Sequence, residues 1–222
     1  MRAREMAKAE RASGTPARLR MVPASLKSPH FFYRIKAPSF EKKDVDLVVR
    51  AAQAYVIQNG IGVAEIAALG VDKLEASEAG AGEALRRLLT CIPGSLMRIG
   101  LDAVLVCEWA SAHIDHAFVG RAFCSFVLGT GEHPYVMQTM HTTTVGGLLE
   151  LVTCTRELVE GDAFVFDPLT PHMAVPKYSS GNQLLVLLQI EVEDRCEEDR
   201  ARLLQAFPPT IDDHDDGWVI GS

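Results

Sequence analysis

From residue 95 onward the chain is a succession of short apolar segments with no helical pattern between them, and this feature restricts the possible folds more than any other. The segments are rich in β-branched, aromatic or leucine residues and are separated by Gly, Pro, Asp or Ser. Strands are expected at residues 96–99, 103–109, 118–128, 135–144, 148–155, 163–166 and 184–192. Such a series of short strands predicts a β-sandwich or barrel. Gly146-Gly147 and Gly129-Thr130-Gly131 are expected at tight connections between strands.

The part of the chain before these strands has a helical pattern. Apolar residues recur at helical spacing from Val45 to Val56, after Ser39, which can cap a helix, and before Asn59-Gly60, which can end one. Further helices are expected at residues 63–69, 72–89 and 193–207. Their apolar stripes would be buried on the outer face of the sandwich. The aromatic cluster at residues 30–33 is expected to pack on the core as an edge segment.

These patterns divide the chain into four regions. Residues 1–38 would form a basic arm and the aromatic edge segment, 39–94 a helical buttress, 95–193 the β core, and 194–222 a closing helix with an acidic tail. The first 22 residues carry six basic side chains against two acidic ones, and we expect a mobile or loosely helical terminus. The acidic run of the tail is expected to be a solvated charge cluster.

Composition restricts the class of protein. At 222 residues and 48% hydrophobic content the chain suits one domain with appendages and a sizeable core. The net charge is −7 and no apolar run approaches the roughly 18 residues of a membrane span, so neither a bilayer nor nucleic acid is an expected partner. Five widely separated cysteines without a CxxC pair indicate reduced thiols. Together with the lack of an apolar signal segment, they predict a cytoplasmic location.

Three residues of the β region form a candidate metal site. His113 and Asp115 are two positions apart, so their side chains share one face if residues 112–117 are extended. His172 follows 59 residues after His113, behind a Gly-Asp turn, a short apolar strand and a proline-bounded loop. Two imidazoles and one carboxylate on one side of a metal make the facial triad of non-haem Fe(II) enzymes, which leaves coordination positions open.

The His-x-Asp pair, the distal histidine and the β-rich sequence between them resemble the Fe(II)/2-oxoglutarate-dependent oxygenases. The resemblance covers residues 96–193. It implies a double-stranded β-helix, which is a jelly roll related to the cupins, buttressed here by helices. It also implies His113, Asp115 and His172 as ligands of Fe(II), 2-oxoglutarate as cosubstrate, and oxidation of a small molecule or side chain.

The sequence departs from this family where the far carboxylate of 2-oxoglutarate should bind. The resemblance implies an Arg or Lys shortly after the distal histidine, at the start of the last core strand, but Gln183 stands there. A neutral amide can donate a hydrogen bond but cannot form a charge-assisted bidentate pair. Arg121, Lys177 and Arg98 are candidate replacements, and Gln138 is a candidate pocket amide.

Other interpretations remain open. A cupin-like metal enzyme that does not use 2-oxoglutarate would explain Gln183, and two imidazoles with a carboxylate could also hold a hydrolytic zinc ion. A non-catalytic β-sandwich binding protein would use the basic arm and the helices as its surfaces. In that case Asp115 would cap a turn, His113 would pack near Trp109, and His172 would be an exposed loop histidine.

Overall fold

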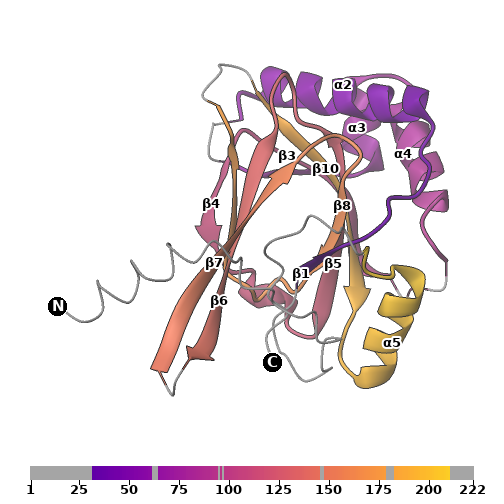
Figure 1. Ribbon diagram of the computed structural model, residues 1–222. Coiled ribbons are helices and arrows are strands. Elements are labelled where there is room, and N and C mark those ends of the chain that lie inside the picture. Colours follow the sequence, from indigo (N-terminus) through magenta and orange to yellow (C-terminus); the bar gives the residue numbers. More distant parts are fainter. Residues whose placement is uncertain are drawn as a thin grey trace.

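The computed structural model describes residues 32–61, 65–94, 96, 98–145, 148–178 and 183–210. Within these residues ten strands form two antiparallel sheets that face each other, and helices pack on the outer side of the larger sheet (Figure 1). None of the helices in this part of the chain has the length and apolar character needed to cross a bilayer.

The larger sheet has six strands and the smaller sheet has four. The larger sheet contains, in spatial order, β1 (Phe32–Arg34), β8 (Ala163–Phe166), β5 (Arg121–Gly129), β10 (Leu185–Glu193), β3 (Arg98–Cys107) and β2 (Ala67–Leu69). The smaller sheet contains β4 (Ala110–His113), β9 (His172–Pro176), β6 (Tyr135–Val145) and β7 (Leu148–Leu158).

The eight strands β3 to β10 pass back and forth between the two sheets. The inner strands of the larger sheet are β8, β5, β10 and β3, and all the strands of the smaller sheet come from the same run of chain. Every neighbouring pair is antiparallel. This arrangement is a jelly roll, or double-stranded β-helix. The expected fold class, mainly β with amino-terminal helices as a buttress, is confirmed.

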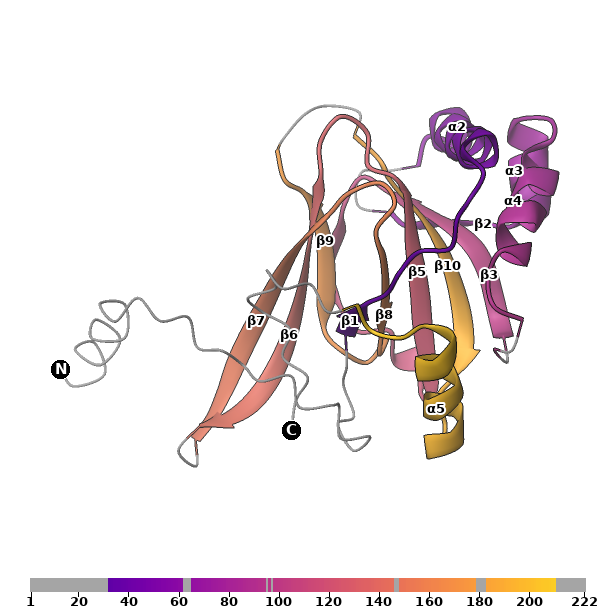
Figure 2. The same ribbon diagram turned by 45° about the vertical axis from the view of Figure 1, so that its right-hand side comes forward.

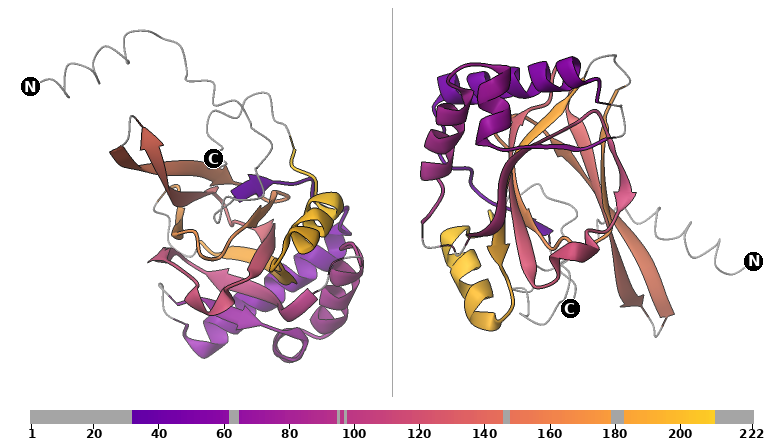
Figure 3. Two further views of the ribbon diagram at one scale, coloured as in Figure 1. Left: turned by 90° about the horizontal axis from the view of Figure 1, so that it is seen from below. Right: turned by 180° about the vertical axis from the view of Figure 1, so that it is seen from behind.

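The helices cover one side of the sandwich. The described helices are α2 (Lys42–Asn59), α3 (Val71–Ser77), α4 (Ala81–Thr90), α5 (Glu197–Ala206) and a short 3-10 helix, η1 (His116–Phe118). Figures 2 and 3 show α2 to α5 on the side of the larger sheet that faces away from the smaller one. Helix α2 buries Val45, Val48, Ala51 and Ala52, which recur at helical spacing, and ends at Gly60, whose φ of 60° is left-handed.

The larger sheet contributes to two separate cores because its side chains alternate between its faces. On β10, Val186, Leu188 and Ile190 face the helices and belong to the outer core. Leu185 and Leu187, which alternate with them, face the smaller sheet and belong to the inner core. The inner core also holds several phenylalanines, namely Phe32, Phe123, Phe164 and Phe166.

Several sequence predictions about helices are wrong. Residues 67–69 of the expected helix at 63–69 form strand β2 on the edge of the larger sheet, where Ala67 pairs with Val106. A short apolar run has too few residues for its periodicity to distinguish a helix from a strand. Here pairing with β3 makes residues 67–69 a strand. The expected helix at 72–89 is broken into α3 and α4 at Gly80, whose φ is 84°. Ser39 does not cap α2, which starts after Glu41 without a side-chain cap.

Strand predictions were closer to the structure. Residues 98–99 and 103–107 of the two expected segments belong to the one strand β3, in which Gly100 has a φ of 91°. The short strands β4 and β9 were not expected, and η1 and a loop replace the start of the strand expected at 118–128. Residues 32 and 33 of the expected aromatic edge segment lie in β1, which pairs with β8 at the edge of the larger sheet, and residues 30 and 31 lie outside the described residues. Gly146-Gly147, the basic arm and the acidic tail lie outside the described residues.

Candidate metal centre

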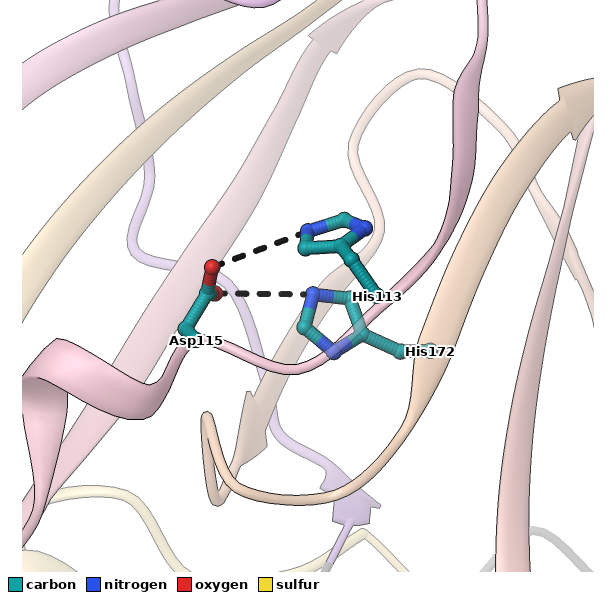
Figure 4. Close-up of side chains that lie close together, drawn as sticks. All are labelled: His113, Asp115 and His172. Carbon is teal, nitrogen blue, oxygen red and sulfur yellow. Dashed lines mark ion pairs between the residues drawn. The ribbon is translucent and has the colours of Figure 1, made fainter.

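His113, Asp115 and His172 come together at the junction of β4 and β9 (Figure 4). The two strands are neighbours in the smaller sheet, and His113 is directly opposite His172, with ring centroids 4.3 Å apart. The Nε2 atom of His113 is 3.7 Å from Asp115 Oδ1, and that of His172 is 3.6 Å from Asp115 Oδ2. One potential ligand atom from each residue lies within 4.8 Å of the others.

Asp115 reaches this position from a turn. Residues 112–117 are not extended throughout, which was the condition for a shared strand face, because β4 ends at His113 and η1 begins at His116. The Asp115 N–H donates to the carbonyl of Pro168, with a distance of 3.0 Å, and its own carbonyl accepts from the N–H of Phe118. These bonds tie the turn to the loop that leads into β9, so the carboxylate is held beside both imidazoles.

Hydrogen bonds fix the orientation of both imidazole rings. His113 Nδ1 lies 2.6 Å from the carbonyl oxygen of Ser111, and His172 Nδ1 lies 2.8 Å from that of Thr170. A carbonyl oxygen only accepts, so Nδ1 of each ring must carry the proton. In the neutral form of each ring the lone pair is then on Nε2, the atom that faces Asp115. Metal-binding histidines are commonly held in this way.

The surroundings of His172 favour a neutral ring. Its side chain is buried, and Phe166 packs against it edge to face, with ring centroids 4.9 Å apart. Burial lowers the pKa of His172 below its usual value, and the nearby His113 lowers it further. Neutral imidazole is the form that binds metals. The alternative in which His172 is an exposed loop residue is wrong, since it is the first residue of β9 and only 8% exposed.

The cluster lines a cavity of about 220 Å³ between the two sheets. Most of the lining is apolar, with aromatic side chains from β5, β8 and η1 and aliphatic ones from both sheets. The lining consists of Ile66, Leu105, Cys107, Ala110, His113, Asp115, Phe118, Phe123, Ser125, Met137, Leu158, Phe164, Phe166, His172, Ala174, Leu185, Leu187, Gln189 and Glu191. A largely apolar cavity with a few converging polar groups is the usual form of a small-molecule site.

Three polar residues of the lining lie on the larger sheet, away from the triad strands. The Ser125 hydroxyl on β5 donates to Gln189 Oε1 on β10, with a distance of 3.0 Å, and both residues are buried. Glu191 is 2% exposed and forms an ion pair with Arg121, whose guanidinium carbon lies 5.7 Å from the centre of the Phe118 ring. Of the sequence candidates for a basic group, Arg121 is thus placed at the edge of the cavity.

Gln183 and Gln138 are not among the residues that line the cavity. The side-chain amide of Gln183 donates to the carbonyl of His133, and the main-chain carbonyl of Gln183 accepts from the Tyr135 hydroxyl at 3.0 Å. Gln138 follows Met137, which does line the cavity, so alternation places Gln138 on the opposite face of β6. Neither glutamine therefore contributes to the described lining of the cavity.

The other two basic candidates are also outside the lining. Lys177 forms a surface ion pair with Glu157. Arg98 lies 3.4 Å from Asp102 and donates to the carbonyl of Leu89 at 3.1 Å. Sequence reasoning missed Glu191, although alternation along the expected strand at 184–192 puts it on the same face as Leu185, Leu187 and Gln189.

Comparisons with known proteins return solved structures alone. No protein-family model matches the chain. No curated protein matches its sequence either.

The carbocyclase SnoK of nogalamycin biosynthesis, described as non-haem and alpha-ketoglutarate dependent, is 12% identical, with a TM-score of 0.45 over 83% of this chain and 90% of its own. The epimerase SnoN of the same biosynthesis, described in the same terms, is 13% identical, with a TM-score of 0.47 over 74% of this chain and 77% of its own. AviO1 from Streptomyces viridochromogenes Tue57 is 13% identical, with a TM-score of 0.46 over 75% of this chain and 90% of its own.

Proposed function

We propose that this protein is a mononuclear non-haem iron oxygenase in which His113, Asp115 and His172 hold Fe(II). The observation that carries the proposal is the convergence of two Nε2 atoms on one carboxylate, with both Nδ1 atoms already bonded to carbonyl oxygens. A catalytic histidine–aspartate pair needs only one histidine beside the carboxylate. Here two histidines present the same nitrogen atom, Nε2, to Asp115. Two imidazoles and a carboxylate on one side of an ion are the ligands of non-haem Fe(II) oxygenases.

The residues present fit the metal. Both rings can be neutral ligands, and the Asp115 carboxylate supplies one negative charge toward a divalent ion. Fe(II) held there would supply the activation of O₂ that protein side chains cannot provide. The chain's own residues do the rest: Phe118, Phe123 and Phe166 exclude water from the space beside the triad and present an apolar surface to a substrate. We infer a small-molecule substrate with a large apolar part.

The residues of the cavity fit 2-oxoglutarate less well than they fit the metal. Its far carboxylate would need a cationic partner inside the apolar space, and the described lining contains neither Arg nor Lys. A hydrolytic zinc site is also poorly supported by the described lining. Such a site needs a general base, and the lining carboxylate outside the triad, Glu191, is ion-paired with Arg121.

An anaerobic titration of the metal-free protein with Fe(II) tests the proposal, with Asp115→Ala as the variant. We expect one equivalent to bind the natural protein, measured by competition with a chromophoric chelator. Removal of supporting residues alone typically lowers metal affinity by about 10- to 100-fold, so loss of a ligand should lower it at least that much.

His116→Ala is the matched control, because His116 adjoins Asp115 in the chain but is not part of the cluster. The control should bind Fe(II) like the natural protein. Unchanged affinity in Asp115→Ala would refute the metal site. Failure of the natural protein to bind Fe(II) would instead favour a binding protein without a metal.

A further inference from the structure

We propose that the cavity takes as its cosubstrate a 2-oxo acid with a single carboxylate and a neutral side chain, in preference to the dicarboxylate 2-oxoglutarate. This inference rests on the proposed function, since a 2-oxo acid would be bound through the metal of the triad. The features that carry it lie on the opposite wall of the cavity, where β10 presents Leu185, Leu187, Gln189 and Glu191.

The charges around the cavity suit one carboxylate. A divalent ion held by Asp115 and two neutral imidazoles keeps one positive charge, and the carboxylate beside the 2-oxo group of a ligand neutralises it. A second carboxylate on the same ligand would be buried among leucine, phenylalanine and methionine side chains. Burying an ion without a partner is strongly unfavourable.

The basic residue that is ion-paired with this wall is already neutralised. Arg121 forms its ion pair with Glu191, which lines the cavity and is 2% exposed. The carboxylate of Glu191 lies against the main chain of β3, since a Cβ atom at Gly100 would lie 2.3 Å from Glu191 Oε2. The ion pair is neutral overall, so Arg121 keeps no net positive charge for a second carboxylate at this wall.

The remaining polar groups of this wall are uncharged. Ser125 and Gln189 are bonded to each other across β5 and β10, and they can meet a neutral side chain without leaving a charge unpaired. Arg156 is another described cation to consider. It pairs in register with Met137, so it shares the inner face of the smaller sheet, but it is half-buried on β7 and outside the described lining.

The test compares two ligands of equal shape on the Fe(II)-loaded protein without O₂. One is 2-oxoglutarate, and the other is 5-methyl-2-oxohexanoate, in which an isopropyl group replaces the far carboxylate. Binding is followed by the visible charge-transfer band of a metal-chelated 2-oxo acid. One unmatched buried charge should favour the neutral-chain acid by at least about tenfold in dissociation constant.

Tighter binding of 2-oxoglutarate would overturn the inference. Iron binding with no band from either acid would also overturn it, while leaving the metal site intact. Failure to bind iron at all would refute the proposed function and the inference together. The three results are separated because iron binding is measured before any acid is added.

Two substitutions test whether the ion pair of Glu191 and Arg121 causes the preference for the neutral-chain acid. Glu191→Gln should release the charge of Arg121 and raise the affinity for 2-oxoglutarate, whereas Glu193→Gln, the same change two residues further along β10 and outside the lining, should leave it unchanged. If Glu191→Gln does not fold, Gln189→Arg serves instead, because it adds a cation to the same wall. Its matched control is Gln138→Arg, on the opposite face of β6.

In Glu191→Gln or Gln189→Arg, the affinity for 2-oxoglutarate relative to that for 5-methyl-2-oxohexanoate should rise by about tenfold. No change in the ratio would contradict the inference. Arg156→Gln should leave the ratio unchanged. A loss of 2-oxoglutarate binding in that variant would identify Arg156 as the missing cation and overturn the inference.

Discussion

The two faces of the larger sheet are built from alternate residues of the same strands, yet they differ in packing and in chemistry. The outer face carries Val104, Val106, Val186, Leu188 and Ile190, which pack closely beneath the helices. The inner face carries large aromatic rings, a hydrogen-bonded Ser-Gln pair and a buried glutamate around an open cavity. Alternate residues of one sheet therefore fill the core beneath the helices on one face and leave a cavity on the other.

Adjacent leucines on β10 give the sharpest test of this difference. Leu188 is fully buried under the helices, whereas Leu187 is half-buried and lines the cavity. Leu188→Ala should lower the free energy of unfolding by about 2–5 kcal/mol, because it opens a new cavity in a closely packed core. Leu187→Ala only enlarges an existing cavity and should cost clearly less. Urea unfolding of the two variants measures both values.

The same pair also separates stability from binding. Fe(II) affinity should be unchanged in folded Leu188→Ala, and ligand affinity should change only in Leu187→Ala. If both substitutions cost the same in stability, the two faces would not differ in packing as described. The comparison uses one residue type on one strand, so differences in chemistry do not enter.

An ion pair in the helical layer should make the outer side of the molecule sensitive to acid. Arg87 on α4 binds Asp44 on α2 through two hydrogen bonds of 2.9 and 2.7 Å, and Asp44 is buried. These hydrogen bonds hold the pKa of Asp44 below its usual value. Because the folded pKa is lowered, the stabilisation is complete above the unfolded pKa of about 3.9 and is lost as the pH falls through the folded value.

Asp44→Asn should therefore lower the free energy of unfolding by about 1–2 kcal/mol at pH 7, a value discounted because the guanidinium is half exposed. The difference between variant and natural protein should shrink steadily below pH 4. Unfolding curves at pH 7 and at low pH give the comparison. A difference that persists at low pH would show that packing, and not charge, holds α2 to α4.

A smaller effect is expected from the polar pair of the inner face. Ser125→Ala removes the hydroxyl that donates to Gln189 Oε1 and leaves a buried acceptor without that bond. It should cost about 1 kcal/mol. Ser77→Ala on the surface of α3 removes a comparable hydroxyl bond to Lys73 and should cost less than about 0.5 kcal/mol. Equal costs for the two variants would indicate that the inner pair is solvated.

The strand pattern predicts a sandwich or barrel, the resemblance to the Fe(II)/2-oxoglutarate oxygenases predicts the jelly roll, and the three candidate ligands lie together as expected. Strand patterns bounded by turn residues are local, and the short separation of His113 and Asp115 keeps them together whether the backbone is extended or turned. The very short strands β4 and β9 were missed because so few residues carry no readable alternation. Likewise, β2 was read as helix because its pairing with β3 is a tertiary contact.

The opposite wall of the cavity was not predictable in the same way. Gln183 was chosen by its distance from His172 along the chain, but β10 begins only at Leu185, and the amide turns toward the carbonyl of His133. Alternation along β10 gives the face on which Glu191 lies, but its place beside Arg121 and against Gly100 depends on the pairing of β10 with β5 and β3. Such relations are set by strands far apart in sequence, so spacing rules do not reveal them.

The most direct test of the central claim is an anomalous diffraction measurement at the iron edge on crystals grown with Fe(II) in the absence of O₂. We expect one strong peak in the cavity, in contact with Nε2 of His113, Nε2 of His172 and a carboxylate oxygen of Asp115. A peak held by other residues, or a well-ordered triad with no iron beside it, would contradict the assignment of these three residues as the metal ligands.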